Sequence, residues 1–66
     1  MKTTTRDAIA DLLVRTESEA ASRHQTAKVD RRKGRLASAI FWECLAEQAD
    51  NRAARLAAML EESEHG

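Results

Sequence analysis

The chain has no proline, two glycines and one cysteine, and one phenylalanine and one tryptophan are its only aromatic residues in a length of 66. Without proline, the commonest helix breaker is missing. Two glycines, one of them the last residue, exclude a glycine-rich phosphate loop. A single cysteine cannot close a disulfide within the chain, so we expect a reducing, cytoplasmic setting. No apolar run approaches the roughly 18 residues of a membrane span, so no membrane partner is expected.

Composition and length predict one small helical domain, residues 1–66. Charged residues make up 33% and hydrophobic residues 42% of the chain, which is typical of a folded rather than a disordered protein. Few side chains are large enough to build a core. Because chains of this size without disulfides or metals usually need a partner for stability, we expect a homodimer.

The polar residues do not form a catalytic or metal-binding pattern. His24 and His65 lie far apart in the sequence, and neither has a second histidine or a cysteine one helical turn away. Glu43, Glu47 and Asp50 share one side of a helix, which we interpret as a solvated outer face. We therefore expect no enzyme, no metal, no cofactor and no small-molecule substrate.

Two long helices are predicted, at about residues 5–30 and 35–63. Thr4 and Asp7 have the spacing of a capping box, so the first helix should begin near residue 5. The stripe of the first helix that should face its neighbour is narrow and holds mostly small residues. It consists of Ile9, Leu12, Leu13, Thr16, Ala20, Arg23 and Ala27. Small residues permit a second helix to lie close against it.

The turn between the helices has two candidate positions. Basic residues before Gly34 favour a helix that ends there, with Gly34 in a left-handed conformation. Alternatively, Asp30 caps the second helix and Gly34 lies inside it. The second helix has one possible break, at Asp50-Asn51, although the apolar residues stay in phase across it.

Large apolar residues of the second helix are expected to be buried. One side of it carries Phe41, Trp42, Leu45, Ala49, Leu56, Met59 and Leu60. Cys44 is interpreted as a small buried hydrophobe among them. The fold class is therefore all-α, an αα-hairpin that dimerises into a four-helix bundle. The predicted interface with a second copy, or with another protein, consists of Ile40, Phe41, Trp42, Leu45, Leu56, Met59 and Leu60.

The charges are unevenly distributed although the formal net charge is zero. Residues 23–35 hold six basic side chains against Asp30 alone, whereas residues 36–66 hold two arginines against six acidic side chains. Such asymmetry favours either an anionic partner or pairing between molecules. The candidate site for nucleic acid or another anionic partner consists of Lys28, Arg31, Arg32, Lys33 and Arg35. The alternative is that these residues end a helix, keep the chain soluble or pair with an acidic protein.

Residues 30–60 resemble the small TraD-type conjugal-transfer proteins, which are accessory factors encoded near plasmid relaxases. The likeness rests on Arg31, Arg32, Lys33, Leu36, Ala37, Ser38 and Leu45. The chain departs from that pattern at Gly34, at Ala37-Ser38 and at Trp42. The resemblance implies an accessory role in plasmid DNA processing, with DNA or a relaxase-like protein as partner, and it places a helix start at Arg31.

The sequence therefore supports two candidate functions. The first is a non-enzymatic accessory protein of plasmid transfer that binds a nucleoprotein complex through its basic turn. The second is an inhibitor or adaptor, of the phage or plasmid counter-defence type, that docks on a protein through an apolar or acidic helix face.

Overall fold

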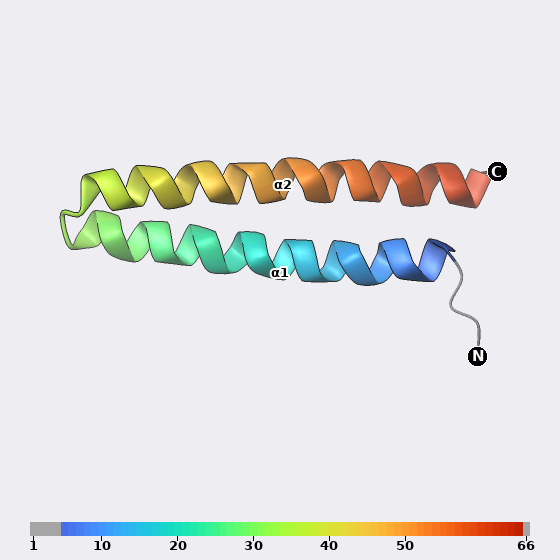
Figure 1. Ribbon diagram of the computed structural model, residues 1–66, viewed down its shortest axis with the longest axis horizontal. Coiled ribbons are helices and arrows are strands. Elements are labelled where there is room, and N and C mark those ends of the chain that lie inside the picture. The colour runs from blue at the N-terminus through green and yellow to red at the C-terminus, as the bar shows by residue number, and fades with distance from the viewer. Residues whose placement is uncertain (1–4, 66) are drawn as a thin grey trace.

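Two antiparallel helices form a hairpin (Figure 1). The computed structural model describes residues 5–65, and their side chains as far as residue 63. Helix α1 spans Thr5–Arg32, helix α2 spans Leu36–His65, and the described residues include no strand. The molecule is a rod of 48 × 23 × 12 Å, with the turn at one end and the first turn of α1 beside the last turn of α2 at the other. The predicted all-α hairpin is confirmed.

Helix α1 begins at Thr5, as the sequence predicts, and Asp7 lies in its first turn. A carboxylate at this position interacts favourably with the positive end of the helix dipole. The other half of the predicted capping box, Thr4, lies outside the described residues.

Backbone hydrogen bonds at the turn decide between the two predicted boundaries. The amide of Arg35 donates to the carbonyl of Asp30 at 2.8 Å, and the amide of Gly34 donates to the carbonyl of Arg31 at 3.1 Å. Together with a φ of +76° at Gly34, these bonds form a Schellman motif. Asp30 therefore caps no second helix, and Gly34 lies between the helices. The helix start at Arg31 that the family resemblance implied is wrong, because Arg31 lies in the last turn of α1.

Replacing Gly34 with alanine should lower the free energy of unfolding by about 1 kcal/mol, because a residue with a Cβ is strained at positive φ. No atom lies within 4 Å of the added Cβ, so a clash would not contribute. Urea titration followed by circular dichroism measures the change. Gly34→Asn is the matched control, since asparagine tolerates this conformation better, and equal losses in both variants would contradict the explanation.

Helix α2 continues through Asp50 and Asn51 without a break and ends at His65, two residues beyond the predicted end. The possible break does not form because the buried positions on either side of it, Ala49 and Leu56, face α1 in one continuous phase. Asp50 caps no helix and instead contacts His24 of α1.

The helices meet along a seam whose residues alternate at three- and four-residue steps, the seven-residue repeat of coiled coils. Every seam residue is buried or half-buried. In α1 the seam consists of Ile9, Leu13, Thr16, Ala20, Arg23, Ala27 and Asp30. In α2 it consists of Ala39, Trp42, Ala46, Ala49, Ala53, Leu56 and Leu60. The α1 stripe predicted from the sequence is confirmed, apart from Leu12, which is exposed.

Small residues occupy half of this seam and all but one of its buried apolar positions. The buried apolar residues are Leu56 and five alanines, Ala20, Ala27, Ala39, Ala46 and Ala49. Phe41 and Met59 are exposed in the single hairpin, so their burial by a second copy or a partner stays a prediction, and the sequence interpretation omitted Ala39 and Ala46. Cys44, expected to be buried, is also exposed. One neighbouring helix covers only a narrow strip of α2, so large residues beside that strip remain in solvent.

Candidate functional site

The five basic residues predicted as an anion site lie around the turn at one end of the rod, and all five are exposed. We call Lys28, Arg31, Arg32, Lys33 and Arg35 the basic turn. Arg31 differs from the others because it binds Glu43 of α2 through two hydrogen bonds, from Nε at 2.5 Å and from Nη2 at 2.6 Å.

Arg31 and Glu43 each stabilise the charged form of the other side chain. The hydrogen bond from Arg31 lowers the pKa of the Glu43 carboxyl from its ordinary value and raises that of the Arg31 guanidinium. Since the Glu43 pKa is lower in the folded chain, the pair stabilises the fold above about pH 4.3, the ordinary value for glutamate. That contribution is lost as the pH falls through the lowered value. Both side chains are partly exposed, so solvent weakens the pair.

Two of the three carboxylates expected on a solvated outer face instead reach α1. Glu43 binds Arg31, and Oδ2 of Asp50 lies 2.7 Å from Nε2 of His24. Glu47 is exposed. The expectation fails for Glu43 and Asp50 because each directly follows a seam residue, so its side chain lies at the edge of the helix contact rather than opposite it.

The acid nearest the turn in sequence, Asp30, is also engaged. It is buried, and the hydroxyl of Ser38 donates to its Oδ2 at 2.5 Å. Asp30 and Glu43 therefore both have partners within the hairpin. Among the described residues, the remaining four cations of the basic turn form no ion pair; these are Lys28, Arg32, Lys33 and Arg35.

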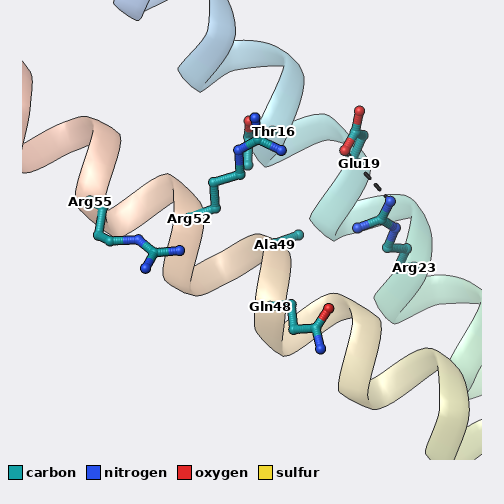
Figure 2. Close-up of a pocket in the computed structure, with 7 residues that line it drawn as sticks. All are labelled: Thr16, Glu19, Arg23, Gln48, Ala49, Arg52 and Arg55. Carbon is teal, nitrogen blue, oxygen red and sulfur yellow. Dashed lines mark ion pairs between the residues drawn. The ribbon is translucent and has the colours of Figure 1, made fainter.

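A second cationic feature lies midway along the rod, and the sequence reasoning missed it. We call it the arginine groove (Figure 2), an open depression of about 340 Å³ lined by Thr16, Glu19, Arg23, Gln48, Ala49, Arg52 and Arg55. Arg23 contacts Glu19 at 3.7 Å and the carbonyl of Leu45 at 3.5 Å. In the described part of the chain, Arg52 and Arg55 have no ion pair. Arg52 and Arg55 lie one turn apart on α2, and the register between the helices brings Arg23 of α1 to them.

The third feature is the side of α2 that points away from α1, which we call the outer face. Its residues nearest the turn are Ala37, Ile40, Phe41 and Cys44, and all four are exposed. The exposed fraction is 54% for Ile40 and 57% for Phe41. Farther along, the outer face continues with Glu47, Asn51, Ala54, Ala58, Glu61 and Glu62, and its edge carries Gln48 and Arg55, which also line the arginine groove.

The residues predicted as a dimer or partner interface divide between the seam and the surface. Leu56 is buried within the hairpin, and Trp42, Leu45 and Leu60 are half-buried. The remaining three, Ile40, Phe41 and Met59, are exposed. The rings of Phe41 and Trp42 pack edge to face with centroids 5.5 Å apart, although neighbouring helix positions point in different directions. Dimerisation into a four-helix bundle stays a prediction.

Among the described residues, no three side chains of histidine, cysteine, aspartate or glutamate gather closely enough to hold a metal ion. Neither helix, over its described length, has the apolar stretch that crossing a membrane requires.

Comparison of the chain with protein-family models, with curated proteins and with solved structures returns no match. The likeness of residues 30–60 to TraD-type proteins therefore stays a hypothesis that rests on the residues named above.

Proposed function

We propose that this protein is a small non-enzymatic accessory factor that binds a nucleoprotein complex by contacting phosphates with its basic turn. One observation carries the proposal: four exposed cations, which form no ion pair with any described residue, lie together at one end of a rod. Lysine and arginine side chains in such an arrangement bind nucleic-acid backbones, and release of counterions supplies the affinity.

The hairpin supports this role by keeping the neighbouring acids away from the four cations. Glu43 is held by Arg31, and Asp30 is held by Ser38 beneath the turn. Lys28 and Arg32 lie one helical turn apart on the side of α1 that faces away from α2. A phosphate backbone can approach this side without meeting the second helix.

Recognition of this kind would follow the backbone rather than the base sequence. The basic turn contains no aromatic side chain on which a base could stack, and phosphate contacts carry no sequence information. If the resemblance of residues 30–60 to TraD-type proteins reflects a relationship, the complex would be a plasmid transfer intermediate, with DNA or a relaxase-like protein at the basic turn.

The test is the salt dependence of binding to a fluorescein-labelled DNA duplex, measured by anisotropy. Wild-type affinity should fall steeply as salt rises, with a slope of roughly −0.9 in log K per phosphate contacted. In the variant Lys28→Gln/Arg32→Gln/Lys33→Gln, the slope should become shallower by about 2 to 3, since three contacts are removed.

The matched control removes three positive charges elsewhere, by Arg15→Gln, Arg52→Gln and Arg55→Gln. If binding depends on the basic turn, this control keeps most of the wild-type slope. An equal change of the salt slope in the two triple variants would show that binding depends on total positive charge rather than on the basic turn. If the protein bound neither DNA nor RNA at low salt, the proposal would be contradicted.

The exposure of Ile40 and Phe41 favours the second candidate, an inhibitor or adaptor that docks on another protein. Docking through an acidic face has less support, because Glu43 and Asp50 are already engaged with α1. This candidate predicts no salt-dependent nucleic-acid binding, together with loss of partner binding when Phe41 becomes polar.

A further inference from the structure

We infer that the outer face of α2 binds a second copy of this chain, with the two α2 helices antiparallel and a two-fold axis passing between residues 47 and 48. The first observation is the distribution of side-chain size along this face. Its large apolar residues, Ile40 and Phe41, lie near the turn, and its small residues, Ala54 and Ala58, lie toward the other end. All four are exposed in the single hairpin.

Antiparallel packing about this axis matches Phe41 to a small residue and sets Ile40 opposite the aliphatic part of the partner's Arg55. Phe41 would lie opposite the partner's Ala54, and Ala37 opposite the partner's Ala58, so an aromatic ring on one helix meets an alanine on the other. The same contacts recur on the other side of the axis, as a two-fold interface requires. Residues 37–58 would form the contact, a length of about 33 Å at 1.5 Å per residue.

Charge complementarity selects this register and direction. The same axis places the basic turn of each hairpin at the level of the partner's Glu61 and Glu62, so the cationic end of each hairpin meets the anionic end of the other. A parallel dimer would place like charges together at both ends. An antiparallel dimer centred on Ile40 and Phe41 would place the basic turn beside the middle of the partner's α2, away from Glu61 and Glu62, and it would bury only the first turns of α2. Both alternatives lack the opposite-charge contacts.

The single hairpin exposes more surface than a compact monomer of the same mass. Its accessible surface is 5171 Å², whereas a compact monomer of 7.4 kDa is expected to expose roughly 4,200 Å². The elongated shape of a two-helix rod accounts for such an excess, and burial of the outer face by a second copy would reduce it. Lys28 and Arg32 would remain outside the contact, because they lie on the side of α1 that faces away from α2, so the dimer leaves these two of the four cations to nucleic acid, while Lys33 and Arg35 lie beside the partner.

Oxidative cross-linking of the variant Asn51→Cys tests the register. Cys44 would lie opposite the partner's residue 51, so mild oxidation should give a covalent dimer on a non-reducing gel. Cysteines at 44 and 51 of one helix are about 10 Å apart and cannot join, since a disulfide needs Cα atoms within about 7 Å. Wild type should cross-link poorly, because its two copies of Cys44 are also about 10 Å apart along the axis.

The double variant Asn51→Cys/Cys44→Ser is the matched control and should not cross-link. Faster cross-linking of wild type than of Asn51→Cys would overturn the register, because it would bring Cys44 against Cys44. Circular dichroism checks that each variant is folded.

Sedimentation equilibrium of the wild-type chain gives an independent readout. A dimer is expected, and Phe41→Glu should weaken its association at least tenfold, whereas Val14→Glu, at a residue 66% exposed on α1, should leave it unchanged. A wild-type monomer at every concentration would overturn the proposal and leave the outer face to a different protein. Both experiments omit nucleic acid, so their failure is distinct from failure of DNA binding.

Discussion

Replacing Ala46 with leucine should lower the free energy of unfolding by about 2–3 kcal/mol, the upper part of the range for an overpacked interior site. Ala46 is fully buried, with an exposed fraction of 0%, and α1 is the element that covers it. A leucine there can fit only if the helices move apart, which would weaken the contacts on both sides of the substitution. Urea unfolding at a fixed protein concentration measures the loss.

The control is Ala21→Leu, which makes the same change at an exposed position of α1. It should alter stability by less than about 0.5 kcal/mol, as surface substitutions usually do. If Ala46→Leu proved as harmless as Ala21→Leu, the close approach of the two helices at this level would be contradicted.

Replacing Leu56 with alanine should cost about 2–3 kcal/mol, the lower part of the range for leucine truncation in a core. Leu56 is the one large apolar residue among those classed as buried, with 7% exposed. It lies in the half of the seam that is farther from the turn, where it closes the hairpin beyond the last of the buried alanines. Thermal and urea unfolding should both detect the change.

Met59→Ala provides the comparison for Leu56→Ala, since Met59 lies one turn farther along α2 but is exposed. Its truncation should cost less than about 1 kcal/mol because little apolar area is removed from the interior. A larger loss for Met59 than for Leu56 would mean that α2 faces α1 with a different side from the one described.

The helices and their connection were predictable because local chemistry determines them. Asp7 marks the first turn of α1, and the basic residues before Gly34 mark its end. What the sequence left open was the choice between Gly34 and Asp30 as the boundary. The Schellman bonds resolve it, since they need Gly34 outside both helices.

Identification of the buried side of α2 was less successful, because size was taken as the guide to burial. Phe41 and Met59 have more apolar area to bury than Ala39 or Ala46, yet the alanines lie in the seam. In a two-helix protein the contact is a narrow strip, and close approach of the backbones favours small residues there. The seven-residue spacing of Ala39, Ala46 and Ala53 was the available signal.

The basic turn could be proposed from the sequence because its residues are contiguous, but its pairing could not. The Arg31–Glu43 and His24–Asp50 contacts depend on the register between α1 and α2, as does the arginine groove. Neither spacing nor composition specifies that register. Only after it is known does it emerge that four of the five cations have no ion pair within the described part of the chain.

Nuclear Overhauser contacts between alanine methyl groups test most directly whether a small-residue seam joins the helices. In a mixed-label sample that separates contacts within a chain from those between chains, the methyls of Ala20 and Ala27 should show intrachain contacts to those of Ala53 and Ala46. Absence of these contacts, with Ile40 and Met59 touching α1 of the same chain instead, would contradict the seam and both surfaces derived from it.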